Sequence, residues 1–207
     1  MHIDRFVQEF AILAPAFLLA ITVHEFAHGY VAFRLGDPTA ERQGRLTLNP
    51  LKHLDLFGVL AFFLMKIGWA KPVPVDSRYF KEPRRDLLWV SLAGIGANCG
   101  LAVGCGVLVR LLATLAGRVP MFFLYPLLRM LVAGVWINLM LAIFNLLPIP
   151  PLDGSKVLAS LLPPRAGASY AKLEPFGFFL LLALFYAGVI ERVMVPLIVV
   201  AQKLLLS

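Results

Sequence analysis

Long apolar runs separated by short polar stretches set the pattern of this chain. Four runs are long enough for a helix that crosses a bilayer, which needs about 20 apolar residues. They cover residues 8–33, 86–116, 121–147 and 175–201. The first is longer than the core of a signal peptide, so we expect it to be retained. The last contains Glu191, Arg192 and Pro196, and we expect it to break or to end early.

A shorter run at residues 54–67 is too brief for a full crossing. We expect this segment to enter the membrane and return, or to lie at the interface. The whole pattern predicts an all-α integral membrane protein, a polytopic helix bundle of about 4–5 transmembrane helices. A single membrane-embedded domain is expected over residues 1–207, with a core at about 8–160 and a C-terminal helical segment at about 175–207.

The composition is that of a membrane protein, and the distribution of positive charge predicts its orientation. The chain is 60% apolar and 15% charged, with a mean hydropathy of +0.83, whereas soluble domains carry about 25% charged residues. Residues 34–85 and 148–174 hold thirteen of the 19 Lys and Arg residues. If 54–67 does not cross, the positive-inside rule places both stretches in the cytoplasm. The net charge of +7 is spread over these loops without interleaved aromatics, so no nucleic-acid partner is predicted.

Three glycines lie in one register within the run at 86–116. Gly96, Gly100 and Gly104 are spaced four residues apart and therefore share one face of a helix. Small residues in that register let a neighbouring backbone approach closely. We expect a tight helix–helix contact along this face.

A histidine–glutamate motif lies inside the first apolar run. His24 and His28 are one helical turn apart, so both imidazoles can reach one metal ion. Glu25 lies beside them, where its carboxylate can take a proton from a water molecule at the metal. Each ionisable side chain at this depth costs about 2–3 kcal/mol, so three together need a compensating partner. The motif predicts a metal site, and the competing interpretation is a buried hydrogen-bonded cluster that fixes packing.

Catalytic zinc sites usually have three protein ligands, so one remains to be found. His2 lies at the far end of the first helix, and we expect His53 to be a solvated loop residue. Asp153 follows residues 145–152, whose three prolines end the preceding helix. From the residues alone, Asp153 is either the third ligand or the cap of a short helix starting at Gly154. It reaches the histidines only if the proline-rich loop folds back towards them, around a water-filled cavity.

Together these features resemble the site-2 protease family of intramembrane zinc metalloproteases. The resemblance rests on the motif His24–His28 and on the segment Asn145–Gly154. The stretches Gly44–Pro50 (GRLTLNP) and Gly68–Val75 (GWAKPVPV) are similar to compact bacterial and archaeal members. Ile95 stands after Ala-Gly where many members have a proline.

The resemblance implies one Zn²⁺ ion per chain, bound by His24, His28 and Asp153, with Glu25 as the catalytic base. It also implies a small membrane-associated β-hairpin-like loop at residues 68–75, near the path of the substrate. Many members carry a PDZ or CBS domain, and this chain is expected to be the compact form without either.

Four further residues are candidates for substrate binding. Asn98 and Asn145 could donate hydrogen bonds to the substrate backbone or to the developing oxyanion, or could bond to neighbouring helices instead. Val73 and Val75 alternate with prolines, which suits an edge strand that holds an unwound substrate by β-addition. A plain turn or an interfacial anchor is the alternative for that segment.

We therefore expect an intramembrane zinc metalloprotease that hydrolyses peptide bonds within or near transmembrane segments of membrane-protein substrates, in regulated intramembrane proteolysis. Its partners would be the lipid bilayer and a transmembrane protein or peptide. Its location would be a prokaryotic cell membrane, with the active site nearer the cytoplasmic side. The alternatives are a non-enzymatic zinc-binding or metal-transporting membrane protein, and an inactive relative that only binds transmembrane partners. These motifs leave the substrate's identity and the oligomeric state open.

Overall fold

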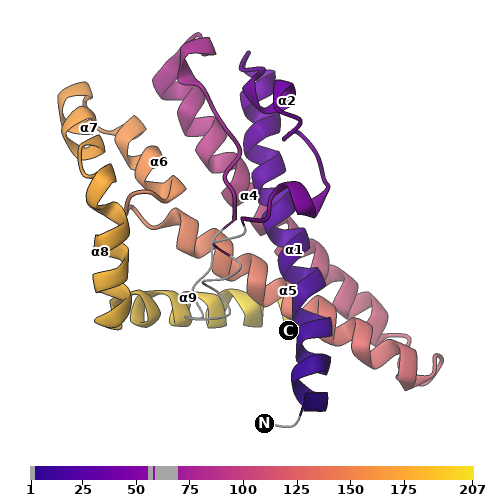
Figure 1. The fold of residues 1–207 in the computed structure, drawn as a ribbon. Helices are drawn as coiled ribbons and strands as arrows, with labels where there is room; N and C mark the ends of the chain where they lie inside the picture. The colour runs from indigo at the N-terminus through magenta and orange to yellow at the C-terminus, as the bar shows by residue number, and fades with distance from the viewer. Residues whose placement is uncertain (1–2, 56–57, 59–69) are drawn as a thin grey trace.

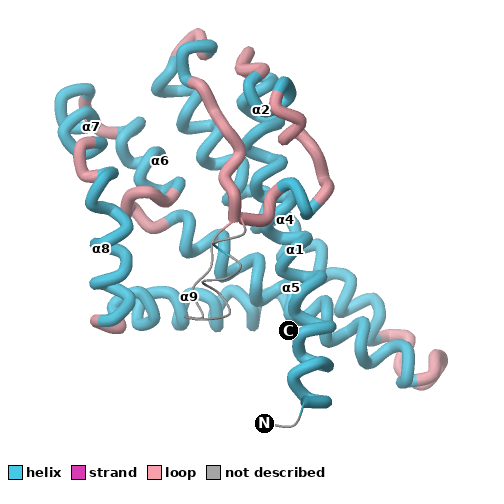
Figure 2. Tube along the Cα trace, in the orientation of Figure 1, coloured by secondary structure: helices cyan, strands magenta, loops and turns pink. Residues whose placement is uncertain are grey.

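The computed structural model describes residues 3–55, 58 and 70–207, and its regular elements are helices (Figure 1). Three long helices form the centre: α1 (Ile3–Arg34), α4 (Pro83–Ala113) and α5 (Met121–Leu146). The shorter elements are α2 (Thr39–Arg42), η1 (Pro50–Lys52), η2 (Ser77–Tyr79), α6 (Asp153–Leu161), α7 (Pro164–Ala171), α8 (Glu174–Tyr186) and α9 (Val189–Leu206). Figure 2 shows the same path without a strand in the described ranges, where Leu54 and Ala70 form an isolated antiparallel bridge.

The three long helices pack against one another in pairs. Each contains a segment long and apolar enough to cross a membrane. These segments are Val7–Arg34, Pro83–Ala113 and Met121–Leu146. Large apolar side chains such as Phe17, Val107 and Phe122 are exposed on them, which suits contact with lipid. The predicted all-α polytopic bundle is confirmed.

The apolar run at 175–201 forms two helices instead of one. The chain turns at Gly188, whose φ of 68° is accessible to glycine at little cost. Figure 1 shows that α9 then turns away from the end of α8 and runs towards α5. Its buried residues pack on α4 and α5. The helices α7 and α8 are bent by 67° and could together form one more span. The described residues thus hold three candidate spans, one fewer than the predicted range of 4–5, or four if this pair forms one span.

Within the described residues, the glycine stripe of α4 makes no helix contact of the kind that its spacing predicts. A methyl group on Gly96, Gly100 or Gly104 would meet nothing within 4 Å in the part of the chain that the structure describes. Close approach occurs instead at Gly106, which lies against the backbone of Leu205 on α9. The prediction was wrong because spacing identifies a face of small residues, but both lipid and a neighbouring helix accept such a face.

The loop between α1 and α4 folds back on itself and fixes the segment 70–73. Arg45 is buried, and its Nη2 donates to the carbonyls of Lys71 (2.8 Å) and Pro72 (3.3 Å). His53 is fully buried rather than solvated, so that prediction was wrong. Its Nε2 donates to the carbonyl of Thr47 (2.8 Å), and its own carbonyl accepts from the amide of Lys71 (2.9 Å). The histidine is buried because this loop packs on residue 71 instead of extending into water.

Further along, the amide of Asp76 donates to Oδ2 of the buried Asp37 (2.7 Å). The segment 70–76 is therefore anchored at both ends. The expected re-entrant segment at 54–67 lies outside the described residues except for Leu54, Asp55 and Gly58. Of the expected hairpin-like loop, residues 68 and 69 also lie outside them.

Candidate metal centre

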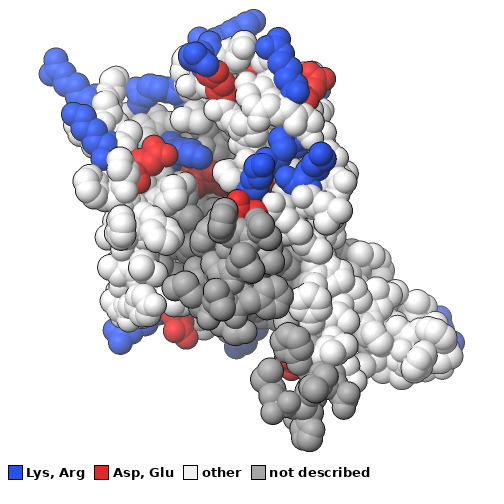
Figure 3. All heavy atoms as spheres, in the orientation of Figure 1, with Lys and Arg blue, Asp and Glu red and all other residues white. Residues whose placement is uncertain are grey.

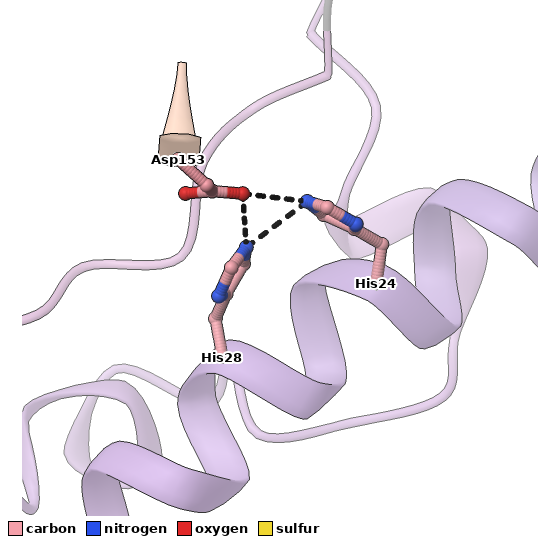
Figure 4. A group of neighbouring side chains, drawn as sticks. All are labelled: His24, His28 and Asp153. Atoms are coloured by element: carbon pink, nitrogen blue, oxygen red, sulfur yellow. Dashed lines mark hydrogen bonds and ion pairs between the residues drawn. The ribbon is translucent and has the colours of Figure 1, made fainter. Parts of the chain in front are cut away.

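Two histidines one turn apart on α1 and Asp153 at the start of α6 converge beside α1 (Figure 4). Nε2 of His24 and Nε2 of His28 lie 3.0 Å apart. Oδ2 of Asp153 lies 3.2 Å from the first of these nitrogens and 3.0 Å from the second. Ligands at about 2.0–2.1 Å from a tetrahedral zinc ion lie about 3.3 Å from one another. The buried triangle therefore has nearly the size of one face of a zinc site.

Hydrogen bonds behind each ring determine which nitrogen faces the triangle. Nδ1 of His28 donates to the carbonyl of Val90 (2.7 Å), which can only accept. Asn98 uses Nδ2 to donate to Oδ1 of Asn138 (2.8 Å), so its own Oδ1 accepts from Nδ1 of His24 (2.6 Å). With a proton on each Nδ1, a neutral imidazole presents the lone pair of Nε2. Metal-binding histidines are typically oriented by such bonds.

Two lone pairs and a carboxylate oxygen thus face one another away from water. Nζ of Lys156 lies 3.7 Å from Oδ1 of Asp153, and this positive charge favours the ionised carboxylate. Three electron-rich atoms at this spacing repel unless positive charge lies among them, supplied by a metal ion or by a proton on one ring. The donor set of two imidazoles and a carboxylate suits zinc.

Gly94 on α4 makes room for both imidazoles. A Cβ at this position would lie 2.5 Å from Nε2 of His28 and 2.6 Å from Cε1 of His24. Both distances are far inside normal carbon contacts of about 3.5–4.0 Å. Every residue with a side chain would displace the rings, so the geometry of the triangle requires glycine here.

Asp153 reaches the histidines because α6 begins directly beside the end of α5. Leu152 holds the N-cap position and Asp153 is the first helical residue, so its carboxylate is not the predicted cap. A Cβ on Gly154 would lie 2.2 Å from the carbonyl oxygen of Leu146, which shows how closely the two backbones approach. The proline-rich loop between them folds back as the ligand interpretation requires.

A cavity of about 320 Å³ opens beside the triangle. Glu25 lines it, and its Oε2 accepts a hydrogen bond from the amide of Val73 (2.8 Å). Val75 lines the same cavity. The segment 70–76 therefore forms one wall of the cavity and touches the candidate base, although no described residue of this segment belongs to a strand.

The two candidate asparagines have different surroundings. Asn145 lines the cavity, and its Nδ2 donates to the carbonyl of Leu141 (3.0 Å). Asn98 is fully buried, and besides its bonds to His24 and Asn138 it donates to the carbonyl of Ala20 (3.1 Å). Its amide is thus used within the protein, which agrees with the interhelical alternative and suits a residue that orients His24.

Sequence reasoning missed Asn138. This residue accepts from Asn98, and its Nδ2 donates to the carbonyl of Gly134 (2.8 Å). The available signal was an amide in the middle of an otherwise apolar run, because such a group is costly in lipid unless it is bonded to protein.

Comparison with known proteins places these features in context. A family model described as peptidase family M50 matches residues 123–187. The Bacillus subtilis protein named "Putative zinc metalloprotease YwhC" is 40% identical over 209 residues, which cover 94% of this chain and 91% of that protein. Two further relatives are named "Putative zinc metalloprotease Rip2". The one from Mycolicibacterium smegmatis is 31% identical, over 90% of this chain and 71% of its own length. The one from Mycobacterium tuberculosis is 32% identical, over 86% of this chain and 68% of its own length. No solved structure matches the chain.

Proposed function

Because the chain belongs to peptidase family M50, the family of the site-2 proteases, we propose that it is a zinc metalloprotease that hydrolyses peptide bonds within or near transmembrane segments of other membrane proteins. The resemblance that the sequence predicted is confirmed by this membership. The observation that carries the proposal is the buried triangle of His24, His28 and Asp153, whose donor set and spacing suit a zinc ion.

In this proposal the three residues of the triangle bind one zinc ion per chain. When bound, the ion would polarise the scissile carbonyl and lower the pKa of a water molecule beside it towards about 7. Glu25 accepts the proton of the attacking water and passes it to the leaving amine. The amide of Val73 occupies Oε2 of Glu25, which leaves Oε1 to take that proton.

The segment 70–76 is the proposed binding site for the unwound substrate. The carbonyl of Val73 and the amide of Val75 bond to no other described residue, so both are available to pair with an extended peptide. Replacing Pro72-Val73-Pro74 by Gly-Ser-Gly should impair cleavage while the zinc content is retained. Unchanged turnover in that variant would refute the β-addition model.

Orientation in the membrane is proposed from the distribution of charge. Figure 3 shows Lys and Arg side chains gathered at the end of the molecule where α2 and α7 lie. By helix rise, His24 lies about 15 Å and His28 about 9 Å from Arg34 at that end of α1. The positive-inside rule makes this end cytoplasmic, so the active site lies nearer the cytoplasmic face.

The decisive experiment compares purified wild-type protein with the variants E25Q, H24A and D153A in detergent. We expect about one zinc per chain in the wild type and in E25Q, and large losses in the two ligand variants. The cleavage probe is a fluorophore–quencher peptide with one apolar span of about 20 residues that is interrupted by Asn-Pro. Cleavage by the wild type and none by E25Q would support the peptidase.

Two outcomes would contradict the proposal. No metal in the wild type after reconstitution with zinc would leave a protonated packing cluster instead. The second outcome is a wild type that binds zinc but cleaves none of a panel of such peptides in a reaction that requires Glu25. This result would favour the metal-binding or metal-transporting alternative. E25Q is a matched variant because glutamine keeps the size of the side chain and an oxygen that can accept from Val73.

A further inference from the structure

Lys156 is a charged residue in the cavity with no role in the mechanism above. It lies one turn after Asp153 on α6, so both side chains share a face. Its Nζ is 3.7 Å from Oδ1 of Asp153, the oxygen that does not make the short contacts with the histidines. This distance exceeds a hydrogen bond of about 2.7–3.2 Å. The Lys156 side chain is 43% exposed, and its ammonium is not hydrogen-bonded to any described residue.

The other hydrogen-bond donors on the cavity wall that could face a carbonyl oxygen are neutral, and some are already used. Nδ2 of Asn145 donates one of its two N–H groups to Leu141, and the amide of Val73 donates to Glu25. The amide of Val75 bonds to no other described residue, and it is neutral. Ser91 has a buried hydroxyl without a partner among the described residues, and it is neutral. Among the described residues that line the cavity, Lys156 alone carries an ammonium or guanidinium. It brings three N–H donors and a positive charge.

Attack of water on a peptide carbonyl creates a need for such a group. The water oxygen bonds to the carbonyl carbon, its proton goes to Glu25, and the electron pair of the carbonyl π bond moves to the carbonyl oxygen. That oxygen becomes an anion, and a positively charged donor already positioned beside it stabilises the charge without further reorganisation. Resting on the peptidase function, we propose that Lys156 is a catalytic residue whose ammonium binds the scissile carbonyl oxygen and stabilises this oxyanion.

A purely structural role for Lys156 makes a different prediction about zinc. If the ammonium only held Asp153 in place, its loss would free the carboxylate and weaken zinc binding about 10–100-fold, as removal of a residue that orients a ligand does. If the ammonium instead serves the substrate, removing a cation beside the metal site leaves zinc affinity unchanged or increases it. Zinc affinity therefore distinguishes the two roles without an activity assay.

The test uses the full-length protein in detergent with the variants K156M, K156R and K203M. Methionine keeps most of the length of lysine without its charge, arginine keeps the charge, and Lys203 lies near the end of α9, outside the cavity lining. Zinc affinity is measured by competition with a chromogenic chelator. Cleavage is measured on a fluorogenic single-span peptide that the wild type turns over in a reaction requiring Glu25.

We expect K156M to lower kcat about 100–1,000-fold with little change in KM, as loss of an oxyanion donor does. Zinc affinity should be retained, K156R should recover most of kcat, and K203M should match the wild type. A phosphinic peptide, which mimics the tetrahedral oxyanion, should lose affinity for K156M by a similar factor. Unchanged kcat in K156M, or a fall in kcat explained by lost zinc, would overturn the proposal. A wild type without cleavage would count against the peptidase function itself, which the zinc measurements on Asp153 and His24 variants test separately.

Discussion

The substitution G94A tests the triangle most directly because it adds one methyl group beside both imidazoles. The added Cβ would lie 2.5 Å from Nε2 of His28 and 2.6 Å from Cε1 of His24. Normal contacts are about 3.5–4.0 Å, so both rings must move by about 1 Å. Zinc–ligand distances tolerate changes of about 0.2 Å. Removing a residue that orients a metal ligand lowers metal affinity about 10–100-fold, and we expect G94A to lower zinc affinity at least as much.

The matched control is G96A, two residues further along the same helix. A Cβ there meets nothing within 4 Å in the described residues. Both substitutions give the helix the same propensity gain, about 0.5–1 kcal/mol, so a general effect of alanine on α4 would appear in both. We expect G96A to bind zinc like the wild type and to unfold at the same or a slightly higher temperature.

The assay is zinc competition with a chelator of known affinity, with circular dichroism to verify that each variant is folded. Folded G94A with reduced zinc affinity, beside normal G96A, is the expected result. If folded G94A binds zinc as tightly as the wild type, then the imidazoles do not pack on α4 as described and the assignment of the ligands to this triangle is incorrect.

Three other changes have clear expected outcomes. N98A should lower zinc affinity about 10–100-fold because Nδ1 of His24 loses its acceptor, whereas N145A should leave it unchanged, as measured by chelator competition. R45M removes the donor to the carbonyls of Lys71 and Pro72. Hydrogen exchange of the backbone amides in 70–73, measured by mass spectrometry, should then accelerate about tenfold, while the zinc content stays normal. Stripping the metal with a chelator should lower the melting temperature and abolish cleavage, and added zinc should restore both; equal melting curves would show that no ion binds the folded state preferentially.

The long helices and the two histidines could be predicted from the sequence because their signals are local. Apolar runs show where α1, α4 and α5 lie, and helical spacing places His24 and His28 on one face. Asp153 could not be fixed this way, since its approach depends on how the chain folds back after α5. Its assignment needed the family resemblance.

Whether a given helix face contacts lipid or another helix was harder to predict, for a physical reason. In a soluble protein, polar residues mark the side of a helix that faces water. In a bilayer both sides of a helix meet apolar surroundings, so neither the glycine stripe of α4 nor the position of Asn138 could be oriented from the sequence. His53 was misjudged because nothing in its local sequence indicates that the loop returns to residue 71.

The place of Asp153 in the chain has a consequence for how the protein is made. His24, Glu25 and His28 enter the membrane with the first helix, but Asp153, the proposed third ligand, is synthesised only after α4 and α5. It reaches them only when the loop after α5 has turned back and Gly154 has settled against Leu146. With Asp153 as the third ligand and Glu25 as the base, as proposed, a growing chain would carry its base long before it could hold the metal. The emerging enzyme would be inert towards neighbouring helices until nearly three-quarters of its length had been built and folded.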